Sequence, residues 1–266
     1  MIVINFQITM QETKQLSGFL LINKPKNITS YACVAKIKKL LGKKAKIGHA
    51  GTLDLLASGL LIIGIDRAAT RYLADVMKLD KVYVATGKLG ELTSSLDYES
   101  EVLETCQKEV TQKDIIHAIQ QLGSAYEQIP PIYSALKHEG KPLYQLARKG
   151  RVSQAELEDV VTQKSRIIQL YNVELINYEF PYFTIRAHVS HGTYIRTLVN
   201  DIARKAGSCA TTYNLERSAI GPFKLENATT LDQLTTIEII ENHIITVEQM
   251  LSLLEHYADL KFGAQT

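Results

Sequence analysis

The amino-acid sequence predicts an α+β fold built on a mixed, largely antiparallel sheet flanked by helices and loops. Two apolar runs, at residues 18–22 and 60–65, are typical of buried strands, and residues 183–189 alternate like a half-buried strand. Helical segments separate these strands, but helices and strands do not alternate strictly as they do in a parallel βαβ fold. With 266 residues, of which 45% are hydrophobic, the chain can bury one large core or two small ones.

The first predicted strand is followed by a helix with clear boundaries. Pro25 ends the strand, since proline cannot donate to a strand ladder. Thr29 or Ser30 can cap the start of the helix, and Gly42 suits its end. The apolar positions of this helix are Cys33, Ile37, Leu40 and Leu41.

The middle of the chain predicts three further helices and one further strand. Residues 69–77 carry apolar side chains at helical spacing, and residues 81–89, which include Tyr83, form the next strand. A helix capped by Thr111 closes at Gly123, and its inward side chains are expected to be Ile115, Ile116, Ile119 and Leu122. After strand 183–189, a turn leads into a helix whose apolar positions are Ile195, Leu198, Ile202 and Ala206.

Three regions can be separated along the chain. Residues 1–16 are interpreted as an N-terminal extension, residues 17–223 as the main body, and residues 224–266 as a short C-terminal segment. The last segment contains seven acidic and two basic residues, so it is a poor candidate for RNA binding. It is expected to form one or two short helices, one of which Thr246 can cap with Glu248 just inside.

Composition excludes several classes of protein. The net charge of +2 means that any affinity for nucleic acid would come from local patches. Cys33, Cys106 and Cys209 are far apart and lack C-x-x-C spacing, which suggests neither a disulfide framework nor a zinc site. Gly42-Lys43 lacks the glycine spacing of a phosphate-binding loop. No apolar run reaches the ~20 residues of a membrane span, and the first residues do not resemble a signal peptide, so a cytoplasmic protein is expected.

Residues 48–59, G-H-A-G-T-L-D-L-L-A-S-G, place one carboxylate, Asp54, among glycines, small residues and leucines. The glycines permit a tight, partly buried loop before strand 60–65. A buried carboxylate is costly unless it is paired, so Asp54 either caps the following element or meets a cation. Arg196 is a candidate partner, because a positive charge in the first turn of a helix opposes the helix dipole and needs a specific reason.

Two basic stretches could contact phosphate groups. Residues 36–46 form either a solvated helix face or a phosphate-binding surface. Residues 128–151 fit either an ordinary surface insertion or a flexible loop that clasps RNA. The first stretch contains Lys36, Lys38, Lys39, Lys43, Lys44 and Lys46; the second contains Tyr133, Lys137, Lys141, Tyr144, Arg148, Lys149 and Arg151.

In their order along the chain, these motifs resemble the TruB family of tRNA pseudouridine synthases, which convert a uridine of the tRNA T-loop to pseudouridine. The resemblance covers residues 18–221, most of the chain, and implies the pseudouridine synthase fold. The motifs are G-H-A-G-T-L-D-L-L-A-S-G at 48–59, Lys81-x-Tyr83, Leu89-Gly90 with Thr93 and Asp97, P-P-I-Y-S-A-L-K at 130–137, and G-T-Y-I-R-T at 192–197.

The resemblance implies roles for individual residues. Asp54 matches the catalytic aspartate, Arg196 the arginine that pairs with it, and Tyr83 the tyrosine that stacks on the target uracil. His49 matches the histidine that fills the space left when the uridine flips out. The other residues expected to contact substrate are Lys24, Tyr194, Leu215, Lys137, Arg148, Lys38 and Lys43, with a purely structural role as the alternative for the first three. The implied reaction needs no metal or organic cofactor, and the implied partner is tRNA. The protein is expected to act as a monomer in the bacterial cytosol, with an organelle as the alternative location.

The sequence also departs from the family's pattern. Leu55 stands where the family has proline after the aspartate, which predicts a less rigid loop. The other replaced positions are Asn23, Asn27, Ser94, Ser95, Leu96 and Glu216. The acidic segment 224–266 is too short for the C-terminal RNA-binding barrel, or PUA domain, of many bacterial members, so that barrel is expected to be missing. The alternative function is therefore a tRNA-folding chaperone that binds RNA with weak or no catalysis.

Overall fold

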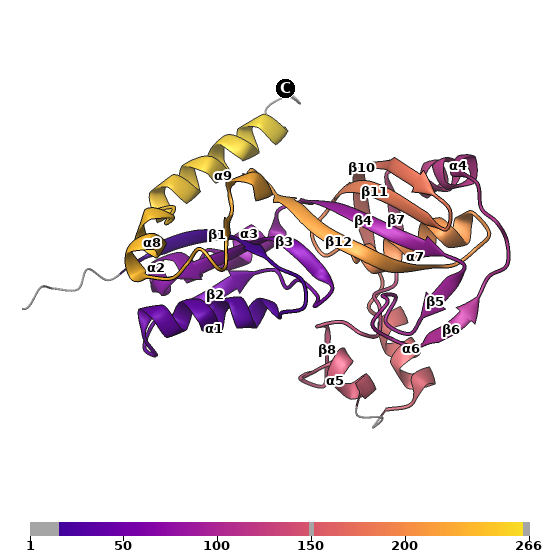
Figure 1. Cartoon of the computed structure of the whole chain (residues 1–266), viewed down its shortest axis with the longest axis horizontal. Coiled ribbons are helices and arrows are strands. Elements are labelled where there is room, and N and C mark those ends of the chain that lie inside the picture. Colours follow the sequence, from indigo (N-terminus) through magenta and orange to yellow (C-terminus); the bar gives the residue numbers. More distant parts are fainter. Residues whose placement is uncertain (1–15, 149–151, 263–266) are drawn as a thin grey trace, which may run out of the picture.

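The computed structural model describes residues 16–148 and 152–262, and the predicted α+β class is confirmed. Its centre is a ten-stranded mixed sheet in the order β14-β1-β3-β12-β4-β11-β10-β7, with β2 and β13 paired to β3 and β12 (Figure 1). The β1–β14 and β3–β12 pairs are parallel, and the other strand pairs of this sheet are antiparallel. The strands are β1 (Gly18–Lys24), β2 (Ile47–Ala50), β3 (Ala57–Ile65), β4 (Lys81–Leu89), β7 (Ala125–Gln128), β10 (Arg166–Glu179), β11 (Tyr182–Val189), β12 (Ala210–Ile220), β13 (Phe223–Lys224) and β14 (Thr229–Thr230).

Helices and two small hairpins complete the described part of the chain. The helices are α1 (Ser30–Leu41), α2 (Asp66–Thr70), α3 (Leu73–Lys78), α4 (Gln112–Leu122), α5 (Leu143–Arg148), α6 (Gln154–Thr162), α7 (Ile195–Lys205), α8 (Ile237–Asn242) and α9 (Val247–Phe262), with a 3-10 turn at Leu225–Asn227. The hairpins pair β5 (Glu91–Thr93) with β6 (Val102–Thr105) and β8 (Lys137–His138) with β9 (Lys141–Pro142).

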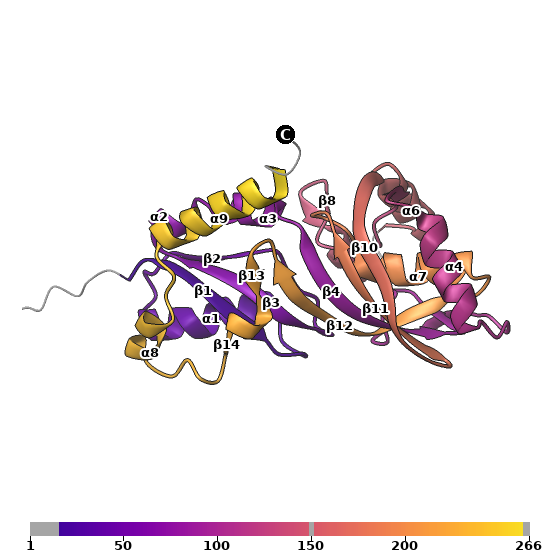
Figure 2. The same cartoon turned by 90° about the horizontal axis from the view of Figure 1, so that it is seen from above.

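Strand β12 joins two halves of the molecule (Figures 1 and 2). The first half holds β1, β2 and β3 with α1, α2, α3, α8 and α9, and the second holds β4, β7, β10 and β11 with α4 and α7. β12 runs parallel to β3 on one side and antiparallel to β4 on the other. Gly59 makes the β3–β12 contact possible, because a Cβ there would lie 2.4 Å from the Arg217 carbonyl oxygen, and its φ is +108°.

Several predicted boundaries are confirmed, because they depend on local chemistry. The Thr29 hydroxyl accepts a hydrogen bond from the Ala32 amide at 3.0 Å and caps α1. Thr111 and Asp114 form a reciprocal capping box at the start of α4. The Thr246 hydroxyl accepts from the amide of Gln249 at 3.1 Å, so α9 also begins where predicted.

Two predictions about local structure are wrong. The single helix expected at 69–77 is two short helices, α2 and α3, separated by a break at residues 71–72. Ile116 was predicted to face inward but is 41% exposed, because α4 packs through Ile115, Ala118 and Leu122. Where it is described, the basic segment 128–151, for which a surface insertion or an RNA-clasping loop is predicted, contains the β8–β9 hairpin and α5. Leu143 and Leu146 of α5 pack against α6 in a small core of their own.

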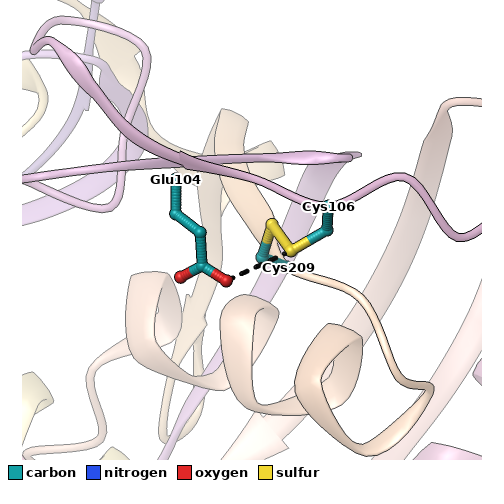
Figure 3. Close-up of side chains that lie close together, drawn as sticks. All are labelled: Glu104, Cys106 and Cys209. Atoms are coloured by element: carbon teal, nitrogen blue, oxygen red, sulfur yellow. Dashed lines mark hydrogen bonds between the residues drawn. A yellow bond between two sulfur atoms is a disulfide. The ribbon is translucent and has the colours of Figure 1, made fainter.

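The expectation that the cysteines form no disulfide is also wrong. Cys106 and Cys209 are bonded to one another (Figure 3), although 103 residues separate them in the sequence. The fold brings the end of β6 next to the start of β12, a contact that cysteine spacing alone does not reveal. Cys33 is free and buried in the first half.

The C-terminal helix α9 packs on the first half and reaches β10 of the second, where the Lys261 ammonium lies 4.6 Å from the centre of the Tyr171 ring. Its Met250 lies in the apolar core of the first half, beside Phe19 and Leu60. Farther along α9, the Tyr257 hydroxyl donates to Asp80 at 2.7 Å and the Lys261 ammonium lies 2.8 Å from the same carboxylate. Among the described residues, no helix combines the length and apolar character needed to cross a membrane.

Candidate active site

The loop that carries Asp54, residues 51–56, lies between β2 and β3 and is held by backbone contacts. The Ser30 hydroxyl at the start of α1 accepts from the Leu53 amide at 2.9 Å, and the Asn27 amide donates to the Leu55 carbonyl at 2.8 Å. Asn27 adopts a left-handed φ of +65°, which asparagine tolerates better than most residues, so asparagine can replace the family's glycine there. The Asp54 side chain is 42% exposed at the surface of this loop.

Arg196 is the partner of Asp54. Its Nε lies 2.9 Å from Oδ2 of Asp54, which decides between the two readings of that carboxylate in favour of a paired cation. The Arg196 side chain is only 5% exposed, so the cation of this pair is buried, whereas the carboxylate is accessible. Its position as the second residue of α7 agrees with the prediction for the helix's first turn.

The rest of the Arg196 guanidinium is occupied by the second half of the molecule. Nη2 donates to the Tyr133 carbonyl at 2.8 Å, and Nη1 donates to the Ser95 carbonyl and lies 3.7 Å from Oδ2 of Asp97. Asp97 is buried and accepts from the Ser95 hydroxyl and the Glu99 amide. This network fixes the guanidinium and leaves Nε directed at Asp54.

Two cavities meet at the Asp54–Arg196 pair. The larger, about 710 Å³, has His49, Leu55 and Tyr133 among its lining residues. The smaller, about 340 Å³, is lined by Tyr83, Tyr194, Leu215 and Arg217. Asp54 and Arg196 line both, so a ligand in either cavity can reach the carboxylate.

His49 lines the larger of the two cavities, and Tyr83 lines the smaller. Tyr83 is 9% exposed and belongs to β4, where alternation directs it to the same face as Ala85. Burial, reinforced by the Arg217 guanidinium, lowers the pKa of His49 below its ordinary value, so its imidazole is neutral at pH 7. Among the described residues, Nδ1 of His49 is buried without a hydrogen-bond partner.

The other predicted substrate residues are placed in different ways. Tyr194 and Leu215 line the smaller cavity. Lys24 is fully buried, and its ammonium donates to the carbonyls of Pro25 and Ile28 at 3.0 and 2.9 Å, so it secures the turn after β1. Burial lowers the pKa of this lysine. Lys38, Lys43 and Lys137 are exposed and line neither cavity, and the Arg148 side chain lies outside the described residues.

Two features of the site were not predicted from the sequence. Arg217 is 1% exposed, and it donates to the Leu60 carbonyl at 2.8 Å and the Gly51 carbonyl at 3.1 Å, on either side of Asp54. It follows Leu215 by two residues in a strand, so the alternation of β12 could have placed both on one face. Asp97 was part of a motif, but its contact with Arg196 depends on the fold.

Known proteins resemble this chain in sequence. Residues 38–195 match the model of the TruB family pseudouridylate synthase N-terminal domain. The chain is 39% identical to "tRNA pseudouridine synthase B" of Clostridium kluyveri over 89% of this chain and 78% of the relative. It is also 39% identical to the protein of that name from Opitutus terrae, over 90% of this chain and 97% of the relative.

A solved structure is similar as well. A "Cbf5-Nop10-Gar1 Complex" contains a chain that is 27% identical, with a TM-score of 0.66, over 89% of this chain and 62% of that one. On the family match and the relatives' identity, this chain belongs to the TruB family of pseudouridylate synthases.

Proposed function

We propose that this chain converts uridine 55 in the T-loop of tRNA to pseudouridine, with Asp54 as the catalytic carboxylate. The observation that carries the proposal is the 2.9 Å pair between an accessible Asp54 and a buried Arg196, placed where two cavities meet. The relatives' shared name, "tRNA pseudouridine synthase B", supports tRNA as the substrate.

The reaction is an isomerisation within one nucleotide. The bond between N1 of uracil and C1′ of ribose breaks, and C1′ becomes joined to C5 of the same base. The hydrogen on C5 leaves to solvent, and N1 gains a proton, so no oxidant or reductant is consumed. A carboxylate can form a covalent link or stabilise a positively charged sugar while the base turns. The Asp54 side chain is exposed enough to reach the nucleotide. Its ion pair with Arg196 holds the carboxylate in a fixed orientation at the cleft.

The remaining residues of the cleft bind and orient the base. A uridine in a stacked loop must leave the stack before its glycosidic bond can be reached. The smaller cavity offers the Tyr83 ring and the Leu215 side chain as apolar walls for the extruded uracil. The neutral His49 ring lines the larger cavity and can occupy the space that the base vacates.

Residues 17–223 are proposed as the catalytic unit, with two basic surfaces that contact the phosphates of tRNA. Lys38 and Lys43 supply charge on and just after α1, and Lys137 supplies charge in the β8–β9 hairpin. Tyr133 and Tyr144 of the basic segment line the larger cavity, where they can stack on unpaired bases. One chain supplies both Asp54 and Arg196, which supports a monomer as the active form.

Tritium release tests the proposal directly. A T-arm stem-loop RNA with 5-tritiated uridines should release tritium with the wild-type protein, and mass mapping should place pseudouridine at position 55. A matched RNA with cytidine at 55 and its other uridines still tritiated should release none. Release from the control RNA would contradict the position, and no release from either RNA would contradict the reaction.

The tRNA-folding chaperone is the second candidate, and Leu55 is the observation that favours it. Leu55 lines the larger cavity beside Asp54 at the position where the family has proline. If the site is live but loosened, Leu55→Pro should raise turnover and leave tRNA affinity unchanged. If neither protein releases tritium while both bind the stem-loop, the chaperone function is favoured.

A further inference from the structure

The Cys106–Cys209 disulfide joins the end of the β5–β6 hairpin to the segment that follows α7, the helix that carries Arg196. Cys106 follows β6 and is half-buried, whereas Cys209 is fully buried and lies just before β12 (Figure 3). Arg196 is at the start of α7, and Cys209 lies four residues beyond the end of that helix. The disulfide therefore attaches the β5–β6 hairpin to the chain segment that carries Arg196.

The same hairpin also contacts both ends of α7. At the start of the helix, the loop between β5 and β6 supplies the Ser95 carbonyl and the Asp97 carboxylate to Arg196. At its end, Nη1 of Arg204 donates to Oε1 of Glu104 at 2.7 Å, and Nη2 donates to the other carboxylate oxygen. The disulfide lies beside this second contact, with Arg204 Nη1 3.9 Å from the sulfur of Cys106.

These contacts argue against a metal at the same place. Glu104, Cys106 and Cys209 bring three ligand-type atoms within 4.8 Å of one another. Both oxygens of Glu104 are engaged by Arg204, and the two sulfurs are bonded to each other. The positive Arg204 guanidinium beside these atoms also repels a cation.

We propose that Cys106 and Cys209 form a thiol–disulfide exchange site, which in its oxidised form holds the β5–β6 hairpin, and through it Arg196, in place. The co-reactant is a dithiol, either a small molecule or a protein. One thiolate attacks the more accessible Cys106 sulfur, the sulfur–sulfur bond breaks, and Cys209 leaves as a thiolate. The second thiolate then releases Cys106, the dithiol becomes a disulfide, and its two protons end on the two cysteines.

Thiol counting tests the chemistry on the full chain. After denaturation without reductant, a maleimide should label one cysteine, Cys33, and after treatment with dithiothreitol it should label all three. Reduction should lower the melting temperature by on the order of 10 °C, because the bridge closes a loop of 103 residues. The Cys33→Ser variant should keep that difference, and the Cys106→Ser, Cys209→Ser double variant should lose it. Three labels without reductant, or two labels gained only after a chelator, would overturn the proposal.

Hydrogen exchange tests the link to Arg196 without any assay of activity. Reduction should increase exchange at residues 94–101, between β5 and β6, and leave β1 and β3 of the first half unchanged. An equal increase everywhere, or none at 94–101, would show that the bridge does not hold this loop. The effect on turnover rests on the proposed function: kcat should fall several-fold on reduction in the wild type but not in the double serine variant. Absence of activity in every form would count against the function and leave the labelling and exchange results valid.

Discussion

The two sides of the cleft are built on opposite principles. On the first half, an exposed acid stands on a short loop, and the cation that secures the loop, Arg217, is buried beneath it and donates to backbone carbonyls. On the second half, the cation itself faces the cleft, and Arg196 is secured by two carbonyls and Asp97. The difference shows how a site can keep a carboxylate accessible to substrate while holding the positively charged partner, Arg196, in a fixed position. The side with the reactive group is held through its backbone, and the side with the partner is held through its side chain.

Arg196→Met should produce the largest effect short of removing the carboxylate itself. The substitution removes the cation at 2.9 Å from Asp54 and leaves Asp97 without its guanidinium contact. Single-turnover pseudouridine formation should fall by about 10²-fold or more. Arg196→Lys, which keeps the charge but cannot make the same set of hydrogen bonds, should recover only part of the rate. Near-normal rates for the methionine variant would contradict the role of Arg196 as the charge partner of Asp54.

Gly59→Ala should strongly destabilise the junction between the halves. A Cβ would press on the Arg217 backbone, 2.4 Å away, at a φ of +108°. The expected loss is roughly 2–4 kcal/mol in the free energy of unfolding, read from urea denaturation. Gly42→Ala is the matched control, because its φ is +93° but no atom lies within 4 Å of the new Cβ. Equal losses in both variants would mean that backbone angle, and not the contact with β12, decides the effect.

Asp80→Asn should weaken the attachment of α9 in a pH-dependent way. Burial alone would raise the pKa of Asp80, but hydrogen bonds from Lys261, His188 and Tyr257 outweigh it and lower the pKa from 3.8 to about 2. A lowered folded-state pKa stabilises the protein above the unfolded value, and that stability is lost as the pH falls from about 4 to about 2. The variant should lose roughly 2 kcal/mol at pH 7 and only about 0.4 kcal/mol at pH 2, with the exposed Asp75→Asn as control. A pH-independent difference would rule out this carboxylate as the anchor.

Replacing four exposed lysines of the first half should give the smallest and most specific effect. With Lys38, Lys39, Lys43 and Lys44 changed to glutamine, the salt dependence of tRNA binding should flatten by up to about one unit of slope for each phosphate that the protein no longer neutralises. Glutamine at Lys113, on α4 of the second half, is the control and should leave the slope unchanged. An unchanged slope in the fourfold variant would mean that these lysines form an ordinary solvated surface and do not contact phosphate groups.

The sequence predicts the parts of this molecule that local chemistry decides. Strand β4 spans the residues expected of it, since alternating side chains mark its length, and Thr29, Thr111 and Thr246 cap the helices where their hydroxyls can reach an amide. The Asp54–Arg196 pair was also expected, because an arginine in the first turn of a helix is unfavourable alone.

What the sequence does not predict depends on contacts across the fold. The bond between Cys106 and Cys209 exists because β6 ends beside the start of β12. The role of Arg217 requires knowing that β12 lies beside β3, and the burial of Lys24 requires the turn that its ammonium closes. Lys38 and Lys43 were predicted to contact substrate because of their charge alone. Charge does not determine how far a residue lies from the catalytic site, and neither lysine lines a cavity.

The most direct test of the catalytic role of Asp54 compares wild type and Asp54→Asn on one tritiated T-arm RNA, with affinity measured alongside tritium release. The asparagine keeps the shape of the side chain and removes the charge that faces Arg196. We expect release by the wild type alone, with affinities that agree within a few fold. Release by Asp54→Asn at a comparable rate would contradict this role, because the carboxylate would then have no part in the chemistry.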